Sequence, residues 1–122
     1  MNLISWFEIP TLDLERAVSF YSRVFNCKLE IHQHEPISFA VFPHVDGEVS
    51  GCLIYDTTGN FMPSPDGVLI YFNMEGRIEE ALKIVDSSGG MGIEHKKQIG
   101  PWGYRALISD SEANRLALYS TS

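Results

Sequence analysis

The sequence predicts an α+β protein made of two tandem β-α-β-β-β modules. Two amphipathic helices are indicated, each preceded by a short apolar segment and followed by three segments typical of strands. Aligning the chain with itself at an offset of 64 residues superimposes the two helices, with Leu14 on Ile78, and also pairs Glu30 with Glu94. Two unrelated amphipathic helices could agree by chance, but the order of strands repeats as well. We therefore predict a duplicated unit.

The first module begins with a strand expected over residues 3–9. Apolar residues spaced i, i+3, i+4, i+7 from Leu14 to Phe25 predict a helix, which Thr11 or Asp13 would cap and Asn26 would end in a left-handed conformation. Three strands are expected to follow, with a turn at residues 44–47 in which Gly47 supplies a positive φ: 28–34, 37–44 and 48–55.

The second module repeats this order. A strand is expected over residues 68–74, and a helix with its apolar face at Ile78, Ala81, Leu82 and Val85 ends at residues 87–90. The strands that follow are expected at 93–98, 104–109 and 115–120. The linker 56–67 contains two glycines and two prolines. We predict modules 1–57 and 66–122 within a single domain, 1–122, because neither half could bury its sheet alone.

Composition excludes several functions. The chain has 122 residues, with 9 Lys plus Arg against 16 Asp plus Glu, and a net charge of −7. Nucleic-acid and anionic-membrane binding both need clustered basic residues, and we expect neither partner. No apolar run reaches the ~20 residues of a membrane span. The two cysteines lack metal-ligand spacing, and no leader-like segment opens the sequence, so we expect a cytoplasmic protein with reduced thiols.

Several motifs resemble one known group of proteins. The segments 6–10 (WFEIP) and 13–17 (DLERA), followed by Phe20-Tyr21, are joined near the C-terminus by 100–103 (GPWG) and 110–115 (DSEANR). Together they resemble the vicinal oxygen chelate superfamily, which includes glyoxalase I, extradiol dioxygenases and the fosfomycin and bleomycin resistance proteins. The resemblance implies a cup-shaped mixed sheet holding the active site, often with a divalent metal, and a homodimer.

The metal positions that the resemblance implies are poor in donors. They correspond to Trp6, to Gly51 or Cys52, to a point near Ile70, and to Ala117. Divalent metals need carboxylate or imidazole donors converging on one point. We therefore predict that the family's metal site is absent and expect no cofactor.

A pair of imidazoles is the other possible metal site. His32 and His34 would lie on one face of a strand, flanked by Glu30 and Glu35, and such a pair could bind zinc or nickel. A solvated strand end is the interpretation we favour.

Glu8 is the candidate catalytic residue. Alternation along the first strand would place Leu3, Phe7 and Ile9 beneath a helix, and Trp6 and Glu8 in the cup. Partial desolvation among Trp6, Ile70, Phe72 and Tyr119 would make Glu8 a candidate general base. The alternatives are an ion pair with Arg115 or Arg105, or a wet rim.

An aromatic wall is the second predicted feature of the cup. Trp102 and Tyr104 would alternate on a strand and join Trp6 and Phe39, although such residues are also common in cores. Arg105 and Arg115 would either attract an anionic group or, as we favour, pair with a surface carboxylate, and Cys52 is most simply a small buried hydrophobe. The full predicted ligand-binding set is Trp6, Phe39, Cys52, Ile70, Phe72, Trp102, Tyr104, Arg115 and Tyr119.

The favoured hypothesis is a homodimeric protein that binds a small, partly apolar molecule in a metal-free cup. No nucleophile–base pair, phosphate loop or dinucleotide motif is present in the sequence. Two alternatives stay open: a metal-dependent lyase, isomerase or dioxygenase of the glyoxalase type, and an interaction protein whose cup is closed by its own side chains.

Overall fold

Two four-stranded sheets form the framework of a computed structural model that describes residues 2–122; residue 1 of the first predicted module lies outside it. The N-terminal sheet has the order β1-β4-β3-β2, and the C-terminal sheet has the order β5-β8-β7-β6. Within each sheet the first strand pairs in parallel with the last, and the other pairs are antiparallel. The bounds of the strands are β1 (Trp6–Pro10), β2 (Glu30–His34), β3 (Ile37–Val41), β4 (Ser50–Asp56), β5 (Ile70–Asn73), β6 (Met91–Gln98), β7 (Tyr104–Ser109) and β8 (Arg115–Ser120). The predicted order of elements, β-α-β-β-β repeated once, is confirmed.

Both helices form where the apolar spacing predicted them. Helix α1 (Leu14–Val24) is capped by Asp13, whose carboxylate accepts from the Arg16 N–H at 3.0 Å, and Asn26 follows its end with a φ of 50°. Helix α2 (Ile78–Val85) continues into the 3₁₀ turn η1 (Asp86–Ser88) and stops at Gly89, whose φ is 102°. Within residues 2–122, no helix has the length and apolar character needed to cross a membrane.

Two local predictions are wrong. Strand β1 begins at Trp6, where its pairing with Ser50 begins, so Leu3 lies before the strand and is fully exposed instead of packing beneath a helix. Trp102 ends the 3₁₀ turn η2 (Gly100–Trp102) and does not alternate with Tyr104 on a strand. Gly103, with a φ of 111°, separates this turn from β7.

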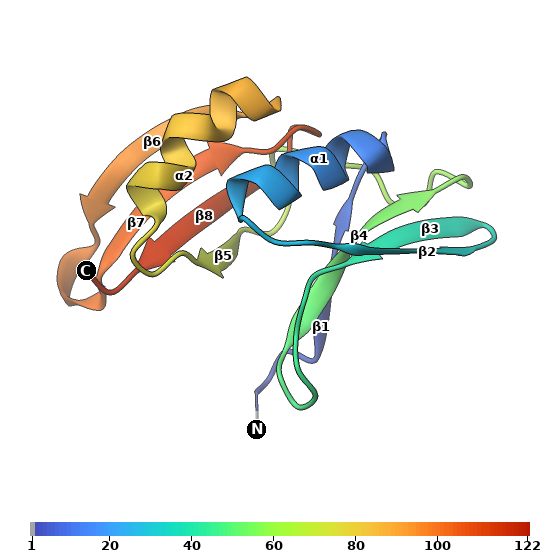
Figure 1. Cartoon of the computed structure of the whole chain (residues 1–122), viewed down its shortest axis with the longest axis horizontal. Helices are drawn as coiled ribbons and strands as arrows, with labels where there is room; N and C mark the ends of the chain where they lie inside the picture. The colour runs from blue at the N-terminus through green and yellow to red at the C-terminus, as the bar shows by residue number, and fades with distance from the viewer. Residues whose placement is uncertain (1) are drawn as a thin grey trace.

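The two helices lie side by side above two sheets that diverge from each other (Figure 1). Helix α1 packs on β3 and β4 of the N-terminal sheet and also contacts η1 of the second module. Its buried face, which includes Phe20, Tyr21 and Val24, joins Leu53 and Leu118 in one core. The helix therefore contributes to the cores of both modules.

An aromatic cluster joins the two sheets on the side that faces the helices. Phe7 of β1 contacts Phe72 of β5 with ring centroids 5.8 Å apart, and Phe25 lies 4.6 Å from Phe72. Phe42 contacts both Phe7 and Tyr21. Each sheet thus has one side that carries these rings and faces the helices. We call these the core-facing sides of the two sheets, and they meet through the rings. The opposite sides, here called the outward faces, consequently point away from each other.

The first strands of the two modules correspond at an offset of 65 residues, although the helices correspond at 64. Phe7 and Phe72 both join the aromatic cluster on the core-facing side. Tyr71, rather than Ile70, therefore occupies the position equivalent to Trp6. Because strand side chains alternate, this one-residue difference exchanges the two faces of β5 relative to the sequence alignment.

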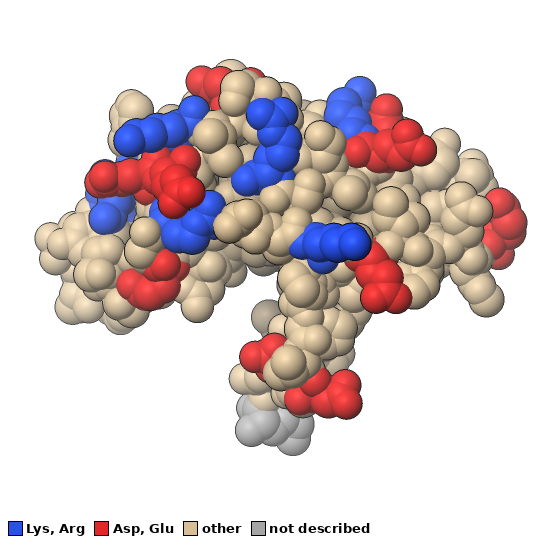
Figure 2. Space-filling view, viewed as in Figure 1, with Lys and Arg blue, Asp and Glu red and all other residues tan. Residues whose placement is uncertain are grey.

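Lysine and arginine side chains are interspersed with acidic ones on the face shown in Figure 2, with no continuous basic surface over the helices. This distribution agrees with the net charge of −7.

Gly51 leaves room for the Phe7 ring, which gives a direct test of this packing. A Cβ at Gly51 would lie 2.4 Å from the Phe7 carbonyl oxygen and 2.5 Å from its ring. We expect Gly51→Ala to lower the free energy of unfolding by about 1–3 kcal/mol through overpacking. The matched control is Gly92→Ala in β6, where a Cβ meets nothing within 4 Å. Urea unfolding of both variants checks this, and equal stabilities would contradict it.

Candidate functional site

The outward face of the N-terminal sheet combines exposed aromatic and acidic side chains with a buried apolar floor. Trp6 and Glu8 lie on this face of β1, and the Cα pairing of Glu8 with Cys52 places Cys52 beside Glu8. Phe39 reaches the same face from β3 and stacks on His32, with ring centroids 5.2 Å apart. Cys52 is 2% exposed, whereas Trp6 is 41% exposed. Four of the predicted site residues thus share one face.

The Cys52 thiol is part of this floor and is not an activated nucleophile. Burial raises the pKa of Cys52 to about 11, and the negative charge of Glu8 also raises it, although a hydrogen bond with Trp6 opposes this change. A thiol with this pKa stays protonated at neutral pH. Cys52 accordingly acts as a small buried side chain, as the sequence suggested.

The outward face of the C-terminal sheet carries tyrosines and an engaged arginine. Arg105 donates to the Tyr71 hydroxyl at 3.0 Å and pairs with Glu94 at 3.2 Å. The Tyr71 and Tyr119 rings lie 6.3 Å apart, and the Tyr119 hydroxyl donates to the Trp102 carbonyl. Because Arg105 is engaged by Glu94 and Tyr71, it does not form the alternative ion pair with Glu8. No ion pair of Glu8 is found in the described part of the chain.

A cavity of 290 Å³ brings three predicted site residues together. Glu8, Ile70 and Arg115 line it, together with Asn114 and residues of the linker between the modules. It therefore lies where the edge strands β1 and β5 approach each other. Its lining thus includes one anionic and one cationic side chain.

The other predicted residues lie elsewhere. Phe72 and Tyr104 pack against the core, and the Lys96 ammonium lies 5.0 Å from the centre of the Tyr104 ring. Trp102 is 71% exposed in the turn η2. The aromatic wall that would unite Trp102 and Tyr104 with Trp6 and Phe39 is not formed within one chain, because these four side chains lie on different surfaces.

The donors at the family's metal positions do not fit a divalent metal. The structure places Trp6, Cys52, Tyr71 and Ala117 there, once the one-residue difference on β5 is included. An indole, a protonated thiol, a phenol and a methyl group do not form the carboxylate and imidazole set that such ions require. Within residues 2–122, no three His, Cys, Asp or Glu side chains converge on a possible ion site.

The histidine pair lies at a solvated strand end. His32 and His34 are both exposed on β2, and His32 contacts the Glu30 carboxylate at 3.0 Å. This arrangement agrees with the interpretation favoured from the sequence.

Glu112, in the turn between β7 and β8, connects the two modules through hydrogen bonds, a role that we did not predict from the sequence. Its carboxylate accepts from the Arg16 Nε at 2.7 Å and from the backbone N–H groups of Leu12 and Asp13 at 2.8 and 2.9 Å. The Glu112 side chain is fully buried, while Arg16 is half exposed. One residue of the second module thereby holds the start of the first module's helix.

Asp110 makes a second connection from the same turn. It accepts from the Tyr21 hydroxyl at 2.6 Å and from the backbone N–H of Glu112 and of Asn114. The Asn114 amide donates to the Pro10 carbonyl at 2.8 Å. We call Asp110, Glu112 and Asn114, with their partners in the first module, the clasp. Alternating polar residues in a turn beside apolar strands are the signal in the sequence that could have indicated it.

The pKa values of the two acids of the clasp, Glu112 and Asp110, shift in opposite directions. Burial alone raises the pKa of Glu112, but hydrogen bonds from Arg16, Leu12 and Asp13 outweigh burial and hold the pKa below its usual value. For Asp110 burial dominates over its hydrogen bonds, and its pKa is raised. Burial and the neighbouring Asp110 charge also raise the pKa of Tyr21 well above its usual value.

The clasp predicts a specific loss of stability in acid. A carboxyl whose pKa is lower in the folded than in the unfolded state stabilises the fold above about pH 4.3, and this stabilisation is lost as pH falls. The pKa of Asp110 is raised in the folded protein, so protonation of Asp110 does not produce this loss. We expect Glu112→Gln to be roughly 1–3 kcal/mol less stable at pH 7 and to lose less stability between about pH 5 and 3.

Denaturant unfolding at several pH values measures this difference. Glu79→Gln on the exposed face of α2 makes the same change of charge outside the clasp and serves as the control. An acid dependence of Glu112→Gln as steep as that of the unmodified protein would show that Glu112 is not responsible.

Comparison with solved structures identifies the fold. A domain described as glyoxylase/bleomycin resistance protein/dioxygenase from a Frankia species superimposes with a TM-score of 0.77 at 16% identity, covering 100% of this chain and 99% of that one. The chain has the glyoxalase/bleomycin resistance protein fold. No family model matches the sequence, and no curated protein matches it. The expected fold, that of the vicinal oxygen chelate superfamily, is therefore confirmed by structure.

Two further neighbours show how widely this fold is used. TnmS3, an antibiotic binding protein from a Streptomyces species, has a TM-score of 0.72 at 20% identity and covers 100% of this chain and 98% of that one. A glyoxalase I mutant from Zea mays has a TM-score of 0.76 at 17% identity, with 96% of this chain aligned to 46% of that one. One fold thus hosts an antibiotic-binding protein and an enzyme, so function must be argued from the site.

Proposed function

We propose that the protein binds a small, partly apolar molecule in a cup that a second copy of the chain completes. The observation that carries this proposal is the pair of outward faces. Trp6 and Tyr71, at equivalent positions of the two modules, are 41% and 46% exposed, and charged groups, Glu8 and Arg105, lie near them. Exposed aromatic side chains beside polar groups are typical of binding surfaces.

A second copy is needed because the two outward faces point apart. The core-facing sides meet through Phe7 and Phe72, so one chain cannot close around a ligand with both outward faces. In a two-fold dimer, the N-terminal sheet of one copy would face the C-terminal sheet of the other, and two equivalent cups would form. Trp6 and Glu8 would then lie opposite Tyr71 and Arg105, and aromatic side chains from both copies would line each cup.

The chemistry of these faces supports binding without turnover. Aromatic walls favour planar apolar partners, and Glu8 would select a cationic or hydrogen-donating group. Cys52 stays protonated, and the donors at the four metal positions do not fit an ion, so we derive no metal-dependent step. The structural similarity to an antibiotic binding protein is a further argument for this function.

The dimer is tested by light scattering at micromolar concentration. We expect a species of twice 13.7 kDa. Tyr71→Asp should weaken association roughly a hundredfold, because it places a carboxylate opposite Glu8 of the other copy, and like charges that face each other across an interface cost several kcal/mol. Ile31→Asp, which introduces the same charge at an exposed position on the core-facing side of the N-terminal sheet, should leave association unchanged. A monomeric unmodified protein would contradict the two-copy cup.

Ligand binding is tested with 9-aminoacridine, a planar aromatic cation, and Trp6 as reporter. In a Trp102→Phe background Trp6 is the remaining tryptophan, and its emission should be quenched in a saturable manner. Phe39→Ala should weaken binding about 3- to 10-fold by removing an aromatic wall. Ile31→Ala, also an exposed apolar residue, is the control. Quenching that neither saturates nor responds to Phe39→Ala would refute binding at this face.

A further inference from the structure

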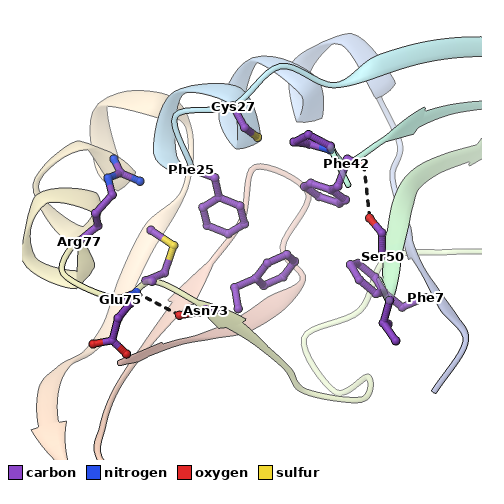
Figure 3. A pocket seen from close by; sticks show the side chains of 12 residues that line it. Phe7, Phe25, Cys27, Phe42, Ser50, Asn73, Glu75 and Arg77 are labelled. Carbon is purple, nitrogen blue, oxygen red and sulfur yellow. Dashed lines mark hydrogen bonds between the residues drawn. The ribbon is translucent and has the colours of Figure 1, made fainter. Parts of the chain in front are cut away.

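A cavity of the described chain lies on the opposite side of the N-terminal sheet from the proposed cup. It has a volume of 430 Å³ and opens between the two modules, below the end of α1. Its wall includes Phe7 of β1, Phe25, which follows α1, and Phe42, which follows β3 (Figure 3). Phe72 of β5 also lines it. These residues belong to the core-facing sides. This cavity, which we call the inter-module cavity, is therefore separate from the outward faces.

Its walls are aromatic surfaces that the core does not fully cover. Phe7, Phe25 and Phe72 are each only partly buried, although their rings contact one another. A volume of 430 Å³ falls within the roughly 300–1,000 Å³ typical of small-molecule sites. Burial of a planar apolar body against these rings would remove more of their surface from water, which is favourable.

The polar groups on the rim of the cavity are mostly hydrogen-bonded within the chain already, which leaves one cation, Arg77, available to a ligand. The Glu75 carboxylate accepts from Ser120 at 3.1 Å and from the Thr121 backbone N–H and hydroxyl at 2.8 and 2.9 Å, which ties it to the C-terminal segment. Figure 3 shows this carboxylate directed away from the phenylalanine rings. Asn73 and Ser50 are each engaged by a backbone partner.

Arg77 is less fully engaged than its neighbours on the rim. It directly precedes α2, and within residues 2–122 its side-chain contact is a 3.4 Å ion pair with the exposed Glu80. Five N–H donors belong to a guanidinium, and this single contact leaves most of them for a bidentate carboxylate. Its positive charge also acts on the partly buried thiol of Cys27 on another part of the wall.

We propose that the inter-module cavity binds a planar aromatic carboxylic acid, with the ring system against the four phenylalanines and the carboxylate on Arg77. This second site differs from the proposed cup in position, in lining and in the charge it selects. The cup would select a cation or a donor through Glu8, whereas the inter-module cavity selects an anion through Arg77.

The test uses 2-naphthoate and its neutral counterpart 2-naphthamide, each titrated calorimetrically into the full chain. We expect 2-naphthoate to bind more tightly, and Arg77→Gln to weaken its binding about ten- to a hundredfold while changing 2-naphthamide binding little. Val49→Phe, which places a larger side chain in the cavity wall, should weaken both. Arg23→Gln removes an exposed arginine of α1 that does not line this cavity and is the matched control.

Alkylation of Cys27 locates the ligand independently of affinity. Cys27 lines the cavity and is partly exposed, whereas Cys52 is buried on the other side of the sheet. Bound 2-naphthoate should slow the modification of Cys27 by iodoacetamide, as followed by mass spectrometry, and leave Cys52 unchanged.

Several outcomes would overturn the second site. The proposal would be wrong if 2-naphthoate did not bind at millimolar concentration, if neither Arg77→Gln nor Val49→Phe changed its binding, or if it did not protect Cys27. If Phe39→Ala weakened the binding of 2-naphthoate and these two variants did not, the acid would be assigned to the outward face. Because Phe39 lies on the outward face and Arg77 lines the inter-module cavity, the proposed cup and the inter-module cavity can fail separately.

Discussion

The clasp is the constraint on which the arrangement of the two modules depends. Glu112 and Asp110, both from the turn between β7 and β8, hold the first turn of α1 and the hydroxyl of Tyr21. These bonds fix α1 against the second module while its apolar face packs on the first. With the helix shared in this way, the core-facing sides of the two sheets must meet, and the outward faces must diverge.

Burial of two acids at one junction is costly unless each lone pair finds a donor. Glu112 is satisfied by a guanidinium and two backbone N–H groups, and its lowered pKa shows that these donors outweigh burial. Asp110 accepts from a phenol and two N–H groups but keeps a raised pKa, because burial dominates. The junction therefore combines a stabilising carboxylate with one that favours protonation. The hydrogen bonds at this junction fix one relative position of the two modules. Apolar packing alone would specify that position less sharply.

The elements that local patterns determine could be predicted from the sequence. Apolar spacing located both helices, and β7 and β8 have the predicted bounds. The facing of β5 could not be obtained in this way, because the helices repeat at 64 residues and the first strands at 65. A one-residue difference reverses a strand, so Ile70 and Phe72 point to the core and Tyr71 to the outward face. The inter-module cavity was also beyond prediction, since its rings come from four separate segments.

Strand β1 separates the two proposed sites by a single layer of backbone. Trp6 and Phe7 are neighbours in sequence, yet one faces the proposed cup and the other faces the inter-module cavity. Gly51 holds this division in place, because only a residue without a Cβ admits the Phe7 ring above it. A shift of β1 by one residue would exchange the two faces and place Glu8 among the phenylalanines. The desolvation of that carboxylate opposes such a shift, so the same alternation that creates two surfaces also keeps their chemistries apart.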